Sequence, residues 1–233
     1  FKRILFPLMP EYIGYADQAL EPRMFTAVKP AVDFLEDRTF KYRVNFDKLR
    51  VTEDIAAIVA SRPTNPTGNV LTDREVARLL DLARSRNIPL ILDNAYGSPF
   101  PQILFTKADP PWDRNVILTY SISKLGLPGV RTGLVIGPEE LVSALSRINA
   151  VVGLASGNVG PELLTPLFKS GQIAELSRRI IRPFYAERAA AAALHFRKCL
   201  DPGLPVYLHR CEGSLFLWIW CKDLPIAGKE LYR

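Results

Sequence analysis

The residues best suited to bind a ligand or carry out a reaction lie together, just past the middle of the chain. Ser121, Ser123 and Lys124 follow an apolar run at residues 116–120, which is short and rich in β-formers and so is typical of a buried strand. Arg131 comes seven residues after the lysine, in a turn rich in glycine and proline. A parallel α/β sheet places its chemistry at the carboxyl ends of its strands, where these residues fall. Two hydroxyls and a guanidinium suit a phosphate dianion, because arginine binds it bidentately and serines donate neutral hydrogen bonds.

Lys124 is a candidate for covalent cofactor binding, since a lysine beside an anchored phosphate can form a Schiff base with pyridoxal phosphate. Taken alone, a lysine or an arginine is more often a solvated surface charge. Ser121 and Lys124 also match the S-x-x-K pattern of penicillin-recognising serine enzymes, and S-x-N and K-S-G occur at residues 156–158 and 169–171. Those two strings lie too close together, and the second ends a helix-like run where a strand is required, so we disfavour the acyl-enzyme interpretation.

Two more strand ends carry polar side chains. Residues 55–60 form a buried run, and Asn65 follows it in an N-P-T-G turn. A helix is predicted next, because residues 72–75 make a capping box and apolar residues then recur with helical spacing. Residues 90–92 form another buried run, which Asp93 closes. A carboxylate there is costly unless it is paired, and a protonated pyridine nitrogen is a suitable partner; a simple N-cap aspartate is the alternative.

Together these segments resemble the fold-type-I aminotransferases. The likeness rests on four ordered elements: P-x-Y with Tyr12, N-P-T-G with Asn65, D-x-A-Y at residues 93–96, and S-x-S-K followed by Arg131. Each element is weak alone, but four in order and mostly at strand ends are specific. The resemblance implies a pyridoxal 5'-phosphate enzyme and covers nearly the whole chain. It departs from the family in two places, since the glycine-rich loop before the first cofactor-binding helix and the later arginine for the substrate carboxylate are absent.

The resemblance implies roles around the cofactor's ring for residues that follow three strands, with Lys124, Asp93 and Tyr96 as the catalytic residues. Lys124 holds the cofactor and, once displaced by the substrate amine, moves a proton between the substrate and the cofactor. Asp93 keeps the ring nitrogen protonated. Tyr96 and Asn65 hydrogen-bond the ring oxygen.

The same resemblance implies purely binding roles for five other residues, and no metal. The ring lies between Tyr12 and Ala95. The phosphate is bound by Ser121, Ser123 and Arg131.

The composition excludes several other classes of protein. With 48% apolar and 23% charged residues, the 233-residue chain is globular. It has no apolar run long enough to span a bilayer and no signal-peptide core, and its three cysteines suit a reducing compartment, so we expect a cytoplasmic protein without a membrane partner. The net charge of +6 is dispersed, which indicates no nucleic-acid partner. His195 and Cys199 share a helical face, but nothing else completes a metal site.

The expected architecture is α/β: a doubly wound, mainly parallel sheet in a cofactor-binding large domain at residues 1–170, with its N-terminal part missing. Residues 171–233 are predicted to form a linking helix and an incomplete α+β small domain. One long helix is expected at residues 172–200, with Pro183 as its kink. Strands are predicted at residues 206–208 and 215–221. Both ends look cut, so the chain resembles an internal segment of a longer protein.

The sequence thus predicts an aminotransferase with a ping-pong mechanism that moves an amino group from an L-amino acid to a 2-oxo acid. Within the family, residues 11–17, 212–218 and 222–225 resemble the members that act on valine and pyruvate. Valine or alanine is therefore the expected donor, and pyruvate or 3-methyl-2-oxobutanoate the expected acceptor, in a homodimer. Two rivals stay open: another reaction on this scaffold, such as carbon–sulfur β-elimination or decarboxylation, and an aminotransferase-like sensor domain of a transcription regulator.

Overall fold

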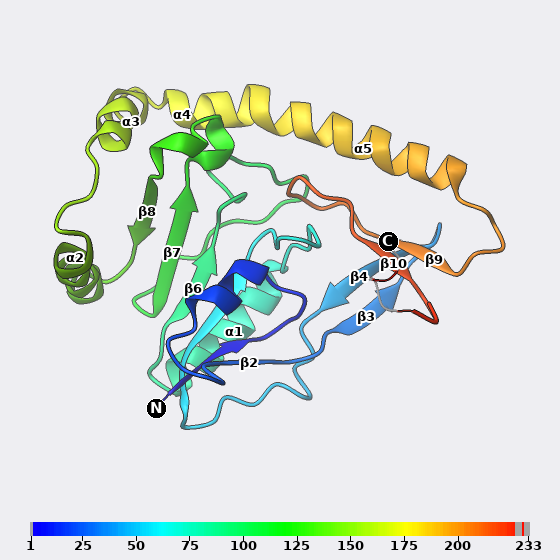
Figure 1. Ribbon diagram of the computed structural model, residues 1–233, viewed down its shortest axis with the longest axis horizontal. Helices are drawn as coiled ribbons and strands as arrows, with labels where there is room; N and C mark the ends of the chain where they lie inside the picture. The colour runs from blue at the N-terminus through cyan, green and yellow to red at the C-terminus, as the bar shows by residue number, and fades with distance from the viewer. Residues whose placement is uncertain (1, 227–229, 231–233) are drawn as a thin grey trace.

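The computed structural model describes residues 2–226 and 230, and its strands form two separate sheets (Figure 1). The larger sheet has six strands in the order β2-β1-β5-β6-β7-β8. Its strands are β1 (Arg3–Phe6), β2 (Phe25–Ala27), β5 (Ile55–Ser61), β6 (Leu90–Asp93), β7 (Val116–Ser121) and β8 (Gly133–Ile136). All neighbours run parallel except β8, which is antiparallel to β7. The predicted α/β class with a mainly parallel sheet is confirmed.

The strand register brings the predicted functional residues to one edge of this sheet. Ser61 pairs with Asp93 across β5 and β6, and Asp93 pairs with Thr119 across β6 and β7. Ser121 then pairs with Gly133 on the antiparallel β8. Because the carboxyl ends of parallel strands meet at the same edge, the loops that follow β5, β6 and β7 converge there.

The core lies between the larger sheet and helix α1 (Asp73–Ser85). The central strands are apolar on both faces, and Ile58, Leu90 and Leu92 are fully buried. Helix α1 begins at the predicted capping box, in which the Thr72 hydroxyl accepts from the Glu75 backbone and the Glu75 carboxylate accepts from the Thr72 backbone. Its buried residues recur at helical spacing, so one face packs on the sheet.

The smaller sheet has four strands in the order β10-β9-β4-β3. Its strands are β3 (Ala31–Phe34), β4 (Thr39–Arg43), β9 (Val206–His209) and β10 (Ile219–Cys221). Strands from residues 31–43 therefore pair with strands from the end of the chain, through a parallel contact between β4 and β9. The predicted domain boundary near residue 170 stays a prediction. The smaller sheet contains two strands from before this boundary and two from after it.

A long helical segment runs across the top of the molecule in Figure 1 and joins the two sheets. It consists of α4 (Gln172–Leu176), a π-helical turn at η4 (Ser177–Ile181) and α5 (Arg182–Cys199). The sequence predicts a single α-helix kinked at Pro183, whereas Pro183 lies in the first turn of α5, directly after the π-helical turn. Proline is tolerated in a first turn, where its missing N–H is not required. The wider turn just before it changes the helical register.

The predicted strand at residues 215–221 is wrong in extent, because only Ile219–Cys221 are in β10. Ser214 has a left-handed backbone (φ 66°), and its N–H donates to the carbonyl of Ile103 at 2.9 Å. Gly213 pairs with Leu104 in an isolated bridge. The chain is thus held on the loop at residues 103–105, and it cannot begin pairing with β9 until after that turn.

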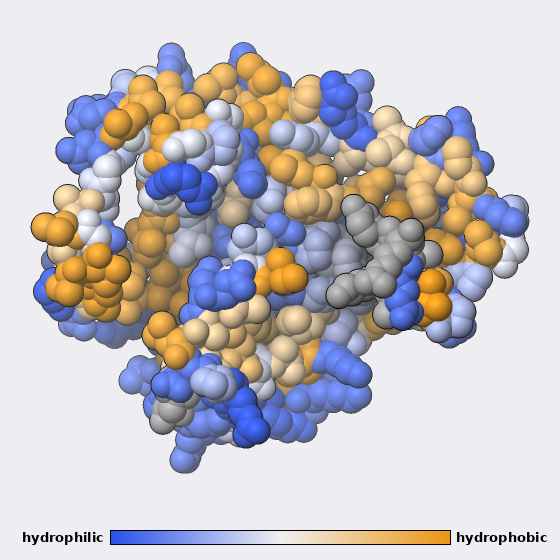
Figure 2. Space-filling view, in the orientation of Figure 1, coloured by the Kyte–Doolittle hydropathy of each residue, from blue (hydrophilic) through white to orange (hydrophobic). Residues whose placement is uncertain are grey.

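The remaining α-helices are α2 (Glu139–Gly153) and α3 (Val159–Lys169), which follow β8 in the chain. Short 3-10 turns lie at η1 (Ile13–Gln18), η2 (Ser123–Leu125) and η3 (Pro128–Val130). No residue of α2 is buried, and its apolar residues show as a patch at the left of Figure 2.

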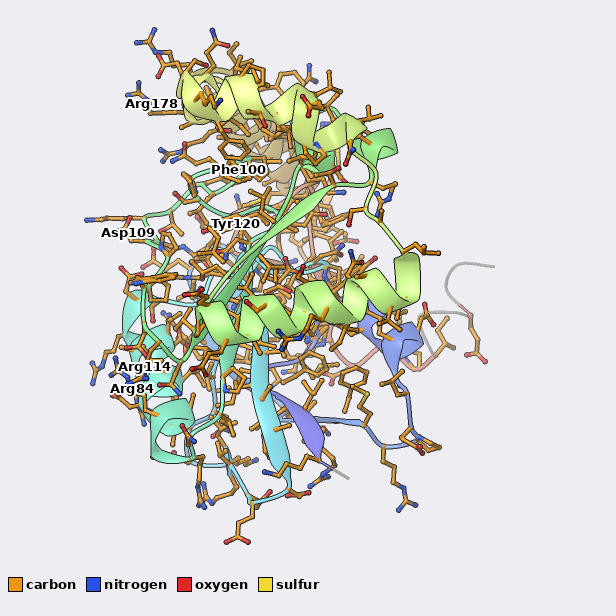
Figure 3. All side chains as sticks on the ribbon, turned by 90° about the vertical axis from the view of Figure 1, so that its left-hand side faces the viewer. Arg84, Phe100, Asp109, Arg114, Tyr120 and Arg178 are labelled. Atoms are coloured by element: carbon orange, nitrogen blue, oxygen red, sulfur yellow. The ribbon has the colours of Figure 1, made fainter. Side chains whose placement is uncertain are left out.

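An aromatic cluster links the sheet to the helices. Phe100 and Tyr120 lie below the helical layer that carries Arg178 (Figure 3), with ring centroids 5.1 Å apart. Phe168 of α3 packs edge-on to Phe100.

Within the described residues, we find no helix that combines the length and the apolar character needed to cross a membrane.

Candidate active site

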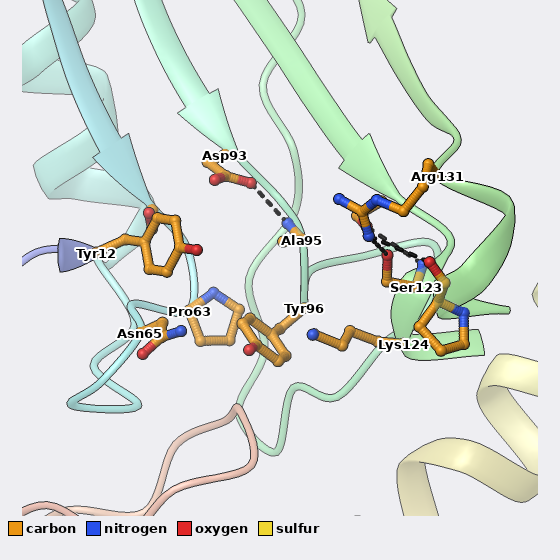
Figure 4. A pocket seen from close by; sticks show the side chains of 12 residues that line it. Tyr12, Pro63, Asn65, Asp93, Ala95, Tyr96, Ser123, Lys124 and Arg131 are labelled. Carbon is orange, nitrogen blue, oxygen red and sulfur yellow. Dashed lines mark hydrogen bonds between the residues drawn. The ribbon is translucent and has the colours of Figure 1, made fainter. Parts of the chain in front are cut away.

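A pocket of about 300 Å³ opens at the carboxyl edge of the larger sheet (Figure 4). Its walls come from the loops after β1, β5, β6 and β7. All nine residues that the sequence predicts to bind the cofactor line it: Tyr12, Asn65, Asp93, Ala95, Tyr96, Ser121, Ser123, Lys124 and Arg131. Ser61, Pro63 and Pro128 complete the lining. Residues from four distant segments thus face one cavity, whose volume suits a small cofactor.

One end of the pocket has the composition of an anion site. Arg131 Nη1 donates to Ser123 Oγ at 3.4 Å and to the Pro128 carbonyl at 3.2 Å. The Ser123 N–H donates to Ser121 Oγ at 3.2 Å, and both serines line the pocket. Arg131 has a left-handed backbone (φ 46°), which turns the chain after η3. A guanidinium beside two hydroxyls can bind a phosphate through charge-assisted and neutral hydrogen bonds.

Lys124 points across the pocket toward Tyr96 (Figure 4). Its Nζ lies 5.5 Å from the centroid of the Tyr96 ring. No carboxylate among the described residues forms an ion pair with Lys124. The amine is therefore free to meet a ligand in the cavity.

Asp93 lies at the end of β6 with both carboxylate oxygens engaged. Oδ1 accepts from the Ala95 N–H at 2.9 Å, and Oδ2 accepts from the Tyr15 hydroxyl at 3.0 Å. No basic side chain in the described part of the chain forms an ion pair with it. Burial raises the pKa of the neighbouring Tyr96 hydroxyl, and the charge of Asp93 raises it further. A cationic ligand would therefore complement Asp93 and leave Tyr96 protonated to donate a hydrogen bond.

Tyr15 and Glu11 belong to the site but were not predicted from the sequence. Burial raises the pKa of Tyr15, as does the charge of Asp93, so its hydroxyl stays a donor. Tyr15 stands three residues after Tyr12 in a 3-10 turn, where such positions overlap, and their ring centroids are 5.7 Å apart. The spacing of the two tyrosines was therefore a sequence signal that could have identified Tyr15. No sequence pattern marks Glu11, because its partner Ser61 lies on a distant strand.

Glu11 is buried, with 7% of its surface exposed, beneath the loop that carries Tyr12. Its carboxylate accepts from the Tyr12 N–H and from the Ser61 N–H, both at 2.9 Å. Burial raises the pKa of Glu11 from 4.5 to about 7, and the backbone hydrogen bond from Ser61 opposes part of that rise. Glu11 thus fixes the loop after β1 to the end of β5, and it changes charge near neutral pH.

The loop that carries Asn65 is held by Arg62, whose side chain is 3% exposed. Arg62 Nε donates to the Leu71 carbonyl at 2.7 Å, and Nη1 donates to the Asp109 carbonyl at 2.8 Å. Nη2 forms an ion pair with Asp73 at 2.5 Å. These contacts connect the N-P-T-G turn to the start of α1. Asn65 therefore has a fixed place at the rim of the pocket.

The match to a known family decides which group of proteins this chain belongs to. Residues 38–212 match the sequence model described as "Aminotransferase class I and II". The chain belongs to this family. Its members use pyridoxal phosphate, so the prediction of family and cofactor from four short motifs is confirmed. The individual roles of the nine residues stay predictions.

Similar proteins include two from the same narrow group. The chain is 45% identical over 232 residues to the valine–pyruvate aminotransferase of Escherichia coli, covering 100% of this chain and 55% of that protein. It is 44% identical to the crystal structure of valine-pyruvate aminotransferase from Salmonella typhimurium, with a TM-score of 0.92, covering 99% of this chain and 58% of that one. Aspartate aminotransferase from Thermus thermophilus, at 17% identity, shares the fold with a TM-score of 0.76 over 97% of this chain and 57% of that one. The chain thus spans little more than half the length of these relatives.

The residues in the pocket fit pyridoxal phosphate. The hydroxyls and guanidinium at one end suit its phosphate, and the amine of Lys124 suits its carbonyl. Asp93, without a cationic partner in the described residues, suits a protonated ring nitrogen. Tyr12 and Ala95 also line the pocket, and an aromatic ring and a small side chain suit the two faces of a flat ring.

Proposed function

We propose that this chain is the cofactor-binding part of an aminotransferase that moves an amino group from an L-amino acid to a 2-oxo acid. The observation that carries this proposal is the convergence of nine side chains, from loops after four strands, on one pocket. Membership in the aminotransferase family supports the reaction class. When bound, pyridoxal phosphate supplies a ring that withdraws electrons from the substrate's α-carbon.

The chain's own residues would bind, orient and move protons. Lys124 would hold the cofactor through its carbonyl and, once displaced by the substrate amine, would act as the base that moves a proton between the substrate's α-carbon and the cofactor carbon. Asp93 holds the proton at the ring nitrogen, since its carboxylate is oriented by hydrogen bonds from Ala95 and Tyr15. Tyr96 donates to the ring oxygen, and its raised pKa keeps it a donor.

The binding residues surround the same ligand. Asn65 would hydrogen-bond the ring oxygen, and the Tyr12 and Ala95 side chains, which also line the pocket, would cover the two faces of the ring. The two serines and Arg131 would hold the phosphate.

We propose valine or alanine as the amino donor and pyruvate or 3-methyl-2-oxobutanoate as the acceptor. The similarity to two valine–pyruvate aminotransferases supports these substrates. A cytoplasmic homodimer is the expected form of the protein. Three free cysteines, at positions 199, 211 and 221, suit a reducing compartment.

Borohydride reduction of the intact holoenzyme tests the assignment of Lys124. Peptide mapping should find the pyridoxyl group on Lys124, because its Nζ faces the pocket. Lys124→Arg should abolish the label, and Lys169→Arg, which changes an exposed lysine at the end of α3, should leave it in place. A label that persists in Lys124→Arg would remove Lys124 from the role proposed.

A substrate assay separates the aminotransferase from its rivals. The intact enzyme with L-valine and pyruvate should yield L-alanine and 3-methyl-2-oxobutanoate. Activity with other amino acids only would correct the substrate and leave the reaction class in place. Release of pyruvate from a cysteine-type substrate without any acceptor, together with no amino transfer, would contradict the aminotransferase and favour β-elimination.

A further inference from the structure

A buried ion pair outside the pocket joins the smaller sheet to the loop that carries Asn65. Lys41 of β4 is 1% exposed and Glu212 is 5% exposed. Lys41 Nζ pairs with Glu212 Oε2, and it donates to the Val70 carbonyl at 3.0 Å and to Asn69 Oδ1 at 3.3 Å. Glu212 Oε2 also accepts from the Val70 N–H at 3.0 Å. Both charged groups therefore hold the end of the segment at residues 63–70, which we call the cofactor loop.

Glu212 begins a turn at residues 212–216, which we call the C-terminal turn. This turn packs tightly against the cofactor loop. A Cβ added to Gly213 would lie 2.5 Å from Pro63 Cγ. A Cβ added to Gly68, whose φ is +68°, would lie 2.6 Å from the Gly213 carbonyl oxygen. Only glycine fits at these two positions. A small displacement of one segment must therefore move the other.

Both segments reach the active-site pocket. Pro63 and Asn65 of the cofactor loop line it. Phe216 of the C-terminal turn packs edge-on to Tyr96, with ring centroids 6.3 Å apart and an interplanar angle of 76°. Figure 4 shows the turn in pale red, running below Asn65 and Tyr96. The ion pair is thus connected to two residues predicted to bind the cofactor's ring oxygen.

A buried ion pair is not explained by stability alone, because desolvation can exceed the attraction between the two charges. Burial lowers the pKa of Lys41, and the charge of Glu212 opposes that effect. Such a pair does fix geometry, because a charge left without its partner in the interior is strongly unfavourable. The position of the turn is therefore closely defined.

We propose that Lys41 and Glu212 are positioning residues for the cofactor site. Their ion pair holds the C-terminal turn on the cofactor loop, and this contact sets where Asn65 and Tyr96 meet the ring oxygen of the cofactor. This inference rests on the proposed function. It adds a residue pair that touches neither the cofactor nor the substrate but fixes the geometry of residues that do.

The test is Glu212→Gln in the intact enzyme, since glutamine keeps the size of the side chain and removes its charge. We expect the dissociation constant for pyridoxal phosphate to rise about tenfold or more, because small displacements of positioned groups have effects of that order. The pH midpoint of the bound cofactor's visible absorbance should also shift, since that absorbance reports the hydrogen bonds to the ring oxygen. A purely structural pair would lower the melting temperature and leave both quantities unchanged.

Asp33→Asn is the matched control. It breaks the ion pair between Asp33 and Arg43, at 2.9 Å, which joins β3 to β4 in the same sheet but is partly exposed to solvent. Neither residue contacts the cofactor loop in the described hydrogen bonds. The control should retain the wild-type dissociation constant and absorbance midpoint.

Phe216→Leu tests whether the C-terminal turn positions Tyr96 if Glu212→Gln does not fold. Phe216 is 38% exposed, so the change has little effect on stability, but it removes the edge contact with Tyr96. We expect the absorbance midpoint to shift and KM to change more than kcat. If the midpoint and cofactor affinity of every variant that folds match those of the wild type, the proposal is wrong. Failure of the wild-type enzyme to transfer amino groups would instead contradict the proposed function, because cofactor binding is read independently of turnover.

Discussion

The free energy of unfolding of the apoenzyme should depend on pH through two buried groups with opposite effects, Glu11 and His209. Burial raises the pKa of Glu11 from 4.5 to about 7. Glu11 is thus protonated in the folded state at pH values where the unfolded chain has lost that proton. Its contribution to stability is fully present below the unfolded pKa and is lost as pH rises through the folded pKa.

His209 has the opposite sign. Its side chain is 2% exposed, and burial lowers its pKa from 6.5 to about 4, with a further contribution from the charge of Lys41. The folded state therefore holds a neutral imidazole where the unfolded chain holds a charged one. This contribution is present above the unfolded pKa and is lost as pH falls through the folded pKa.

The two contributions are similar in size. A change from 4.5 to about 7 for Glu11, at about 1.4 kcal/mol per pH unit, corresponds to about 3 kcal/mol. The change from 6.5 to about 4 for His209 gives the same order, about 3 kcal/mol. Because the windows overlap, the wild-type protein should show little net dependence on pH from these two groups between about pH 4.5 and 6.5.

Single variants should reveal each slope. We propose urea unfolding of the intact apoenzyme at intervals from about pH 4 to 8. Relative to Glu11→Gln, the wild type should lose about 3 kcal/mol as pH rises through the Glu11 window. Relative to His209→Gln, it should gain a similar amount as pH rises through the His209 window. Any penalty for the glutamine hydrogen bonds does not vary with pH and leaves these slopes unaffected.

Because the two groups change the free energy of unfolding with pH in opposite directions, each variant serves as a control for the other. If the curve for Glu11→Gln runs parallel to that of the wild type at all pH values, Glu11 does not change its proton affinity on folding. The argument from burial would then fail. Parallel curves for both variants would contradict the account of the two buried groups together.

Three further predictions concern single hydrogen-bonding groups. Tyr15→Phe removes a donor at 3.0 Å from Asp93, so the rate of the half-reaction with an amino acid should fall about tenfold, as a bond to a charged group is worth about 1.5–3 kcal/mol; an unchanged rate in stopped-flow absorbance would exclude a role for this contact. Arg131→Lys should weaken pyridoxal phosphate binding about tenfold in a fluorescence titration, because lysine cannot bind phosphate bidentately, and equal affinity would place the phosphate elsewhere. Thr72→Ala removes the hydroxyl that accepts from Glu75 and should lower the free energy of unfolding by about 1 kcal/mol in urea titrations, with cofactor affinity unchanged; a loss of cofactor affinity would contradict this separation of capping from binding.

Much of the site could be predicted from the sequence because its residues directly follow strands. The runs that end before Asn65, Asp93 and Ser121 are short, apolar and bounded by turn residues. Parallel strands place their carboxyl ends at one edge, so a correct prediction of strands already predicts which loops converge. The start of α1 could also be predicted from a local signal, since a capping box involves residues only three positions apart.

The tertiary structure decided which distant side chains hold those residues in place. Tyr15 and Asp93 are 78 positions apart, and Lys41 and Glu212 are 171 positions apart. No local pattern marks such pairs, because a buried lysine and a solvated lysine look the same in a sequence. The misjudged strand at residues 215–221 has the same cause: its apolar residues favour a strand locally, but the turn before it is held on residues 103–105. Secondary structure follows short-range propensity, whereas these contacts form only when folding brings separate loops to the same place.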